Sequence, residues 1–370
     1  MSVGWVLPRF GTGSVADVVG SVCDGLKVPG AWDLLELGGS SRVVVLVIDG
    51  VGHHQLSAHA DLVPTLVAAQ TGVLTSVTPS TTPVALTSIG TGLSPGQHGL
   101  VGASFLLPES GDVLWPLNWR SDPPPVQVQP EPTWWERAAR AGVTVSVVSP
   151  RAYSAGGLTA AALRGGTYIG ADGPGERVAE IAAAVRRGSR SLVYAYWEFV
   201  DRAAHMQGVG SAHYRAELHA ADQFVAAVCD ALPAGARLIV TSDHGLVDCP
   251  SAVDLDTVDG LADEVAVVAG EPRFRHVYTR PGAAPDVAAA WRSGLAGRAE
   301  IVMRDEAIAS GWFGPVAPGI RDRIGDVLAV ATGDVRLALP SRDAGVSSLI
   351  GQHGSLTPAE MDVPLVVIDA

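Results

Sequence analysis

The chain has 370 residues, of which 47% are hydrophobic and 17% are charged. It is therefore long enough to bury a large core, in one big domain or in a core domain with an insertion. Its formal net charge of −13 argues against a surface that binds a nucleic-acid polymer through its phosphates. No apolar run approaches the ~18 residues that a membrane-spanning helix needs, so we expect no membrane association.

The cysteines indicate a reducing compartment. Cys23, Cys229 and Cys249 are widely spaced and form no CxxC pair, which argues against both a disulfide framework and a cysteine-rich zinc site. The first residues, MSVGWVLPRFGTG, contain neither a basic n-region nor a long apolar h-region, so they do not resemble a signal peptide. We therefore expect a cytoplasmic protein with free thiols.

Strand and helix patterns alternate along the chain, which predicts an α/β fold with a mainly parallel sheet flanked by helices. The first strong strand covers residues 42–49 and ends in Asp49. Further along, Thr82 precedes Pro83, the pattern of a helix N-cap followed by proline at the first helical position. A hydroxyl at a helix N-terminus lies beside free N–H groups, which suits a nucleophile that attacks a phosphoryl group, although plain threonine caps are commoner.

Two later apolar strands are each followed by an acidic residue. Asp201 follows residues 191–200 and stands four residues before His205, so both face one side of a helical turn and can share a metal. In RLIVTSDHG, the run LIV is typical of a strand buried on both faces, and Asp243 and His244 come directly after it. Ligands bind at the carboxyl ends of strands in open α/β sheets, and Asp and neutral His suit zinc and similar metals.

Residues 265–343 have a different pattern, in which short strands surround one helix. We interpret them as a smaller α+β subdomain that is inserted into a core of residues 1–264 and 344–370 and caps its site. The closing segment, GQHGSLTPAEMDVPLVVI, contains His353 between two glycines and then a terminal buried strand.

The inserted segment contains three candidate substrate contacts. In EPRFRHVYTR, Arg273 and Arg275 would share one face of a strand, and His276 would take the other. The planar fork of arginine suits a phosphate or a carboxylate. Two solvated arginines on an edge strand are an equally good interpretation.

These residues together predict a two-metal site at one edge of the sheet. Acidic residues stand at three apparent strand ends, three histidines accompany them, and one hydroxyl stands at a helix start. Each residue type is common, but this placement is not. The residues are Asp49, Asp201, Asp243, His205, His244, His353 and Thr82.

The same stretches resemble the alkaline phosphatase superfamily and, within it, the type I phosphodiesterase/nucleotide pyrophosphatase family. The matching motifs are VLVIDG, STTPVALTSIGTGLSPGQHG, DRAAHMQG, TSDHG and GQHG, in the family's order. The resemblance implies two divalent metal ions, usually zinc, with manganese as an alternative. It assigns one ion to Asp49, Asp243 and His244 with contact to Thr82, and the other to Asp201, His205 and His353.

The resemblance also implies a hydrolase of phosphoric esters that acts on a small soluble phosphoester through a phospho-threonine intermediate. Spacing from the downstream TG and HG dipeptides assigns the nucleophile to Thr82, whereas counting from Pro83 favours Thr81. We expect a phosphodiesterase or nucleotide pyrophosphatase. The resemblance leaves the oligomeric state open.

The chain departs from the family where the substrate would be recognised. Ala103 stands where an asparagine usually contacts a phosphoryl oxygen, and Ala85 and Leu86 replace an Asn-His pair. A phosphomonoesterase, a phosphonate hydrolase or a phosphomutase of the same superfamily therefore remains an alternative. A non-catalytic, metal-stabilised binding protein is a further alternative.

Overall fold

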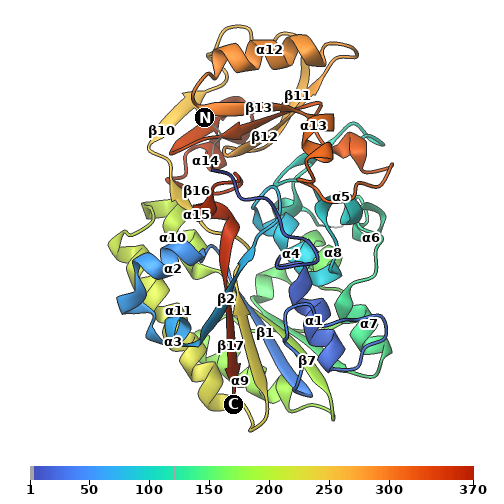
Figure 1. The fold of residues 1–370 in the computed structure, drawn as a ribbon, viewed down its shortest axis with the longest axis vertical. Coiled ribbons are helices and arrows are strands. Elements are labelled where there is room, and N and C mark those ends of the chain that lie inside the picture. Colours follow the sequence, from blue (N-terminus) through green and yellow to red (C-terminus); the bar gives the residue numbers. More distant parts are fainter. Residues whose placement is uncertain (1–3, 121) are drawn as a thin grey trace.

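The computed structural model describes residues 4–120 and 122–370. In these residues the main element is a seven-stranded sheet in which all strands except β17 run in the same direction (Figure 1). This arrangement confirms the predicted α/β fold with a mainly parallel sheet. In order across the sheet, the strands are β2 (Gln70–Thr75), β17 (Asp362–Asp369), β8 (Arg237–Thr241), β1 (Arg42–Ile48), β7 (Ser191–Trp197), β5 (Thr144–Ser149) and β6 (Thr167–Gly170).

Helices cover both faces of this sheet, which is why β1 is apolar at nearly every position. Val43, Val45 and Val47 belong to one core cluster, and the intervening Val44 and Leu46 belong to another. A strand buried on both faces needs this unbroken apolar run. The first cluster includes residues of α1 (Asp17–Gly25), α4 (Thr82–Thr91) and α7 (Trp134–Arg140), and the second includes residues of α9 (Pro174–Val185), α10 (Phe199–Gln207) and α11 (Ala212–Ala231).

A second sheet lies beyond the carboxyl ends of the parallel strands (Figure 1). It has four antiparallel strands, and Trp291 of the helix α12 (Ala284–Gly294) packs in one cluster with Val277 and Val327 of the sheet. The predicted limits of an inserted subdomain at residues 265 and 343 stay a prediction. In order across the sheet, the strands are β11 (Val265–Glu271), β12 (Phe274–Thr279), β14 (Val327–Ala331) and β13 (Ala299–Met303).

The structure also contains short strands and helices outside the two sheets. No helix in the described ranges is long and apolar enough to span a bilayer. Three strand pairs are β3 (Phe105–Leu106) with β4 (Val113–Leu114), β9 (Val247–Asp248) with β16 (Gly351–Gln352), and β10 (Ser251–Asp254) with β15 (Val335–Ala338). The remaining helices are α2 (His53–Ala58), α3 (Pro64–Ala69), α5 (Pro95–His98), α6 (Pro125–Val128), α8 (Gly157–Ala162), α13 (Arg304–Ala309), α14 (Pro340–Ser347) and α15 (Pro358–Met361). Four 3₁₀ turns in the described residues are η1 (Ala60–Leu62), η2 (Pro116–Asn118), η3 (Arg151–Tyr153) and η4 (Arg321–Arg323).

Two predicted element boundaries were wrong by a few residues. The strand predicted for residues 191–200 ends at Trp197, because the amide of Arg202 already donates to the carbonyl of Glu198 and a helix begins. Asp201 therefore lies in the first turn of α10 and not at a strand end.

The start of α4 also differs from the sequence pattern. Thr82 is the first helical residue, and the N-cap is the extended residue Thr81, whose carbonyl accepts from the amides of Val84 and Ala85. The shift places the Thr82 hydroxyl in the first turn of the helix, where Pro83 has no N–H and the amides of Val84 and Ala85 already donate to the Thr81 carbonyl.

Candidate active site

A cavity of about 670 Å³ lies where the parallel strands end, a volume within the usual range for small-molecule sites. Its lining includes Asp49 and Thr82 from the main sheet and its helices, together with Glu271 from the second sheet. The two sheets therefore share one cavity.

The first of the two predicted ligand sets lies on the loops after β1 and β8. Asp49, Asp243 and His244 are buried, and one ligand atom from each lies within 4.8 Å of the others. His244 Nε2 is 3.5 Å from Asp49 Oδ1 and 3.6 Å from Asp243 Oδ2. The hydroxyl of Thr82 is 3.1 Å from the same His244 nitrogen. The structure thus brings the predicted nucleophile against the first set.

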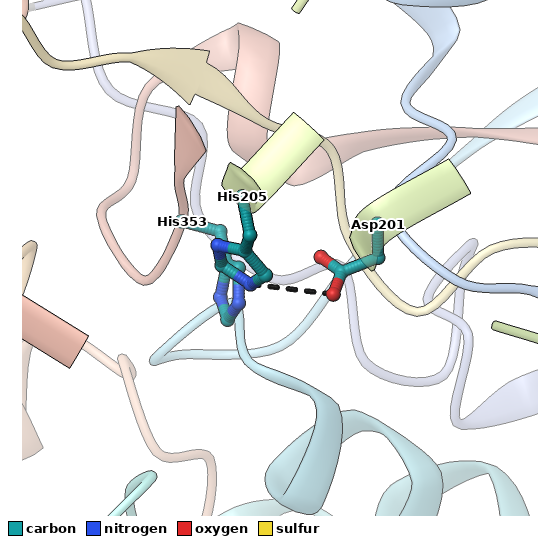
Figure 2. A group of neighbouring side chains, drawn as sticks. All are labelled: Asp201, His205 and His353. Atoms are coloured by element: carbon teal, nitrogen blue, oxygen red, sulfur yellow. Dashed lines mark ion pairs between the residues drawn. The ribbon is translucent and has the colours of Figure 1, made fainter. Parts of the chain in front are cut away.

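The second predicted set also comes together. Asp201 and His205 extend from α10 toward His353, which lies on the loop after β16 (Figure 2). His205 Nε2 is 3.2 Å from Asp201 Oδ2. The ring of His353 stacks on that of His244, with centroids 3.8 Å apart. The two sets therefore adjoin through these rings.

Unpartnered carboxylate oxygens indicate that cations fit this site. Asp49 Oδ1, Asp243 Oδ2 and Asp201 Oδ1 are buried and have no hydrogen-bond partner among the described residues. Buried polar atoms are normally paired, and buried charges normally have a partner or coordinate a metal. Three such oxygens beside three imidazoles match the N and O donors that zinc and similar divalent ions prefer.

The histidines are oriented as metal ligands would be. Each can donate its Nδ1–H to a backbone carbonyl, which fixes the ring and leaves Nε2 free as a ligand atom. The pairs are His205 with Gly351 (2.7 Å), His244 with Gly245 (3.1 Å) and His353 with Ser80 (3.0 Å).

The pKa values of the metal-free site reflect its density of charge. Burial raises the pKa of Asp49 well above its usual value, and the carboxylates of Asp243 and Asp201 add to this effect. Burial alone would lower the pKa of His205, but the Asp201 carboxylate outweighs it and raises that pKa to about 9. Burial likewise opposes ionisation of Asp201, yet His205 lowers its pKa overall. Asp201 and His205 thus form an ion pair when no metal is present.

Two further side chains at the site were not predicted from the sequence. The hydroxyl of Tyr196 donates to Asp49 Oδ2, and Glu271 Oε2 accepts from the hydroxyl of Thr81 at 3.1 Å. Tyr194 and Tyr196 are two residues apart on β7 and therefore share a face of the strand. This spacing is the sequence signal that could have identified Tyr196. Glu271 has no local sequence signal, because its partner is 190 residues away.

The three predicted substrate contacts lie elsewhere, and none of them lines the cavity. Arg273 and Arg275 are fully buried in ion pairs. Arg273 donates to both oxygens of Glu360, at 3.0 and 2.8 Å, and Arg275 pairs with Asp343. The prediction of a free, substrate-facing arginine was wrong, and so was the alternative of solvated arginines.

His276 is equally occupied. Its Nε2–H donates to the carbonyl of Val101 at 3.0 Å, and its Nδ1 accepts from the amide of Gly325 at 3.1 Å. Burial lowers the pKa of His276 to about 4, so the ring is neutral. It joins segments of the chain and has no nitrogen left for a substrate.

Comparison with known proteins decides the family. Residues 43–356 match the family model described as type I phosphodiesterase / nucleotide pyrophosphatase. The chain belongs to this family. It is therefore a phosphoester hydrolase of the alkaline phosphatase superfamily, as the motifs predicted. No curated protein sequence matches it.

Solved structures share the fold of this phosphodiesterase-family chain at low sequence identity. Murine ectonucleotide pyrophosphatase/phosphodiesterase 5 has a TM-score of 0.70 at 18% identity, over 88% of this chain and 87% of its own. Phosphonoacetate hydrolase from Sinorhizobium meliloti 1021 has a TM-score of 0.69 at 20% identity, over 90% and 91%. Both comparisons support the alkaline-phosphatase-like fold.

We predict that the purified phosphodiesterase-family chain binds two divalent ions per molecule, and that binding at the set that contains His205 weakens as the pH falls below about 9. A metal must displace the proton that His205 holds with a pKa of about 9, so each unit below that value costs up to about tenfold in apparent affinity. Elemental analysis and chelator competition between pH 6 and 9 measure both properties. Affinity that is independent of pH would contradict the prediction.

We also predict that Arg273→Ala destabilises the protein and does not act through substrate binding. Glu360 would be left as a buried carboxylate without its cation, which typically costs about 3–5 kcal/mol. Urea unfolding measures the loss. An unchanged free energy of unfolding with a raised KM would instead restore Arg273 as a substrate contact.

Proposed function

We propose that this chain is a phosphodiesterase that hydrolyses a small phosphodiester with Thr82 as its nucleophile. The observation that carries the proposal is the Thr82 hydroxyl, 3.1 Å from His244 Nε2 and next to buried, unpartnered carboxylate oxygens inside the cavity. Asp49, Asp243 and His244 would hold one divalent ion, and Asp201, His205 and His353 the other. Zinc suits these donors best, with manganese as the alternative.

Thr82 is a better nucleophile than its neighbour Thr81. The Thr81 hydroxyl already donates to Glu271 at 3.1 Å, whereas the Thr82 hydroxyl points at the first ligand set. Thr82 also lies in the first turn of α4, where the positive end of the helix dipole favours an anionic oxygen and a phosphoryl group.

The reaction would proceed in two displacements. Thr82 Oγ1 attacks phosphorus and loses its proton, the P–Oγ1 bond forms, and the bond to the leaving oxygen breaks, so that this oxygen takes up a proton and departs as an alcohol. The oxygen of a water molecule then attacks the phospho-threonine and forms a new P–O bond while the P–Oγ1 bond breaks. A phosphomonoester leaves, and a proton from the water returns to Thr82 Oγ1. Two bound divalent ions supply Lewis-acid stabilisation of the attacking and leaving oxygens.

The cavity supports a diester better than a monoester. Arg202 is the one arginine in its described lining, which contains no lysine, and large apolar side chains such as Trp115 and Leu117 line it as well. A singly charged diester with a bulky organic group suits such a lining better than a doubly charged monoester. Murine ectonucleotide pyrophosphatase/phosphodiesterase 5 has been solved, in an inactive form, in complex with AMP, which supports a nucleotide-like ligand.

We further propose that residues 265–343 form an inserted cap on a core of residues 1–264 and 344–370. Gly270 and Glu271 line the cavity from this segment, which supports a role in substrate choice. The free thiols of Cys23, Cys229 and Cys249 support a cytoplasmic setting. The expected ligand is a small phosphoester, not a nucleic-acid polymer or a membrane.

We predict faster turnover of bis-(4-nitrophenyl) phosphate than of 4-nitrophenyl phosphate, by at least about tenfold in kcat/KM, or ~1.4 kcal/mol in transition-state binding. Both nitrophenyl esters would be assayed with zinc and with manganese, and phosphonoacetate would be tested as a third substrate under the same conditions. Preference for the monoester or for the phosphonate would favour the alternative enzyme classes. Metal uptake without turnover of any substrate would favour a binding protein.

We predict that Thr82→Ala lowers kcat by at least about 10³-fold while the fold and both metal sites persist, because it removes the attacking atom. Thr82→Ser retains a hydroxyl and serves as the matched control. Circular dichroism and metal content check the fold and the sites. Near-normal activity in Thr82→Ala would mean that Thr82 is not the nucleophile.

A further inference from the structure

The hairpin that joins β11 to β12 is the part of the second sheet that reaches the proposed catalytic site. Glu271 pairs with Phe274 at its corner. Gly270 has a φ of 90°, and a Cβ there would lie 2.1 Å from the Phe274 carbonyl, so only glycine permits this turn. The path of the chain at the hairpin tip therefore depends on Gly270.

Two sets of contacts attach the hairpin tip to the main domain. The amide of Gly270 donates to the carbonyl of Ser104 at 3.0 Å, and the Ser104 hydroxyl donates back to the Gly270 carbonyl at 3.0 Å. On the other side, Arg273 binds Glu360, which also accepts from the amide of Ser355 at 3.0 Å. The tip is thus held between the segment of Ala103 and the loop that follows His353.

Between these anchors, Glu271 touches both the nucleophile segment and a proposed metal ligand. Its Oε2 accepts from the Thr81 hydroxyl at 3.1 Å and lies 3.4 Å from His353 Nδ1. The side chain also packs on Gly354, where a Cβ would lie 2.8 Å from Oε1. Glycine is favoured after His353 because Gly354 has a φ of 122°, and the absent Cβ leaves room for Glu271 in this position.

We propose that Glu271 is a positioning residue, through which the second sheet orients both His353 and the segment that carries Thr82. His353 Nδ1–H already donates to the carbonyl of Ser80 at 3.0 Å, and Glu271 Oε2 is a second acceptor 3.4 Å from the same nitrogen. The two acceptors together hold the imidazole ring and strengthen Nε2 as a ligand, as carboxylates do around metal-bound histidines. The same oxygen of Glu271 holds the Thr81 side chain, so the hydroxyl next to Thr82 does not compete at the site. This role rests on the proposed function and extends it to the second sheet.

The test compares Glu271→Ala with Glu271→Gln in the full-length, metal-loaded protein. We expect Glu271→Ala to weaken one of the two zinc sites about 10- to 100-fold in chelator competition and to lower kcat with little change in KM. Glu271→Gln keeps an acceptor for Thr81 and should retain most of both properties. Thr81→Val removes the same contact from the other side, so its effect should not add to that of Glu271→Ala.

Asp343→Asn is the matched control, because Asp343 is a buried carboxylate in the region of the second sheet and does not line the cavity. Asp343→Asn should lower the free energy of unfolding, because Arg275 loses its charged partner, but it should leave both zinc affinities unchanged. Wild-type zinc affinities and kcat in Glu271→Ala, or an equal loss in Asp343→Asn, would overturn the positioning role. If Glu271→Ala does not fold, wild-type zinc affinities and kcat in Thr81→Val would overturn it. Failure of the wild-type chain to bind zinc and to cleave any ester would instead overturn the proposed function.

Discussion

The structure depends on placing three carboxylates close together in a buried site. Asp49, Asp201 and Asp243 each have an oxygen without a partner among the described residues. Burial and mutual repulsion raise the pKa of Asp49, so without a counter-charge the cluster resists full ionisation. Two divalent ions would remove this conflict, and the three imidazoles stand where such ions need neutral donors. The fold thus places negative charge in a buried site, where bound cations would balance it.

The second constraint is the orientation of the histidines. Each is held through Nδ1 by a backbone carbonyl, of Gly351 for His205, of Gly245 for His244 and of Ser80 for His353. For His353 that carbonyl belongs to Ser80, two residues before Thr82. The backbone that orients one proposed metal ligand is therefore the backbone that carries the proposed nucleophile. A shift of this segment would change the position of both His353 and Thr82.

Much of the core fold could be predicted from local patterns. The apolar run in β1 and the amphipathic pattern of α11 depend only on neighbours in sequence. The two proposed ligand sets could likewise be predicted, from the motifs around Asp49, Asp201 and Asp243. The predicted end of β7 was wrong because the run of β-prone residues that includes Tyr196 and Trp197 extends past the strand to Phe199. Tertiary packing determines that a helix begins there.

The role of the second sheet could not be read from the sequence in the same way. The basic residues of EPRFRHVYTR suggested a substrate contact, but whether an arginine is free depends on partners far along the chain. Arg273 is neutralised by Glu360, 87 residues away. The side chain of that hairpin that does reach the cavity is the acidic Glu271. Burial raises the pKa of Glu271 well above its usual value, so a cation at the proposed metal site would favour its charged form. The geometry of the second sheet would then be coupled to the proposed metal site and not only to the substrate.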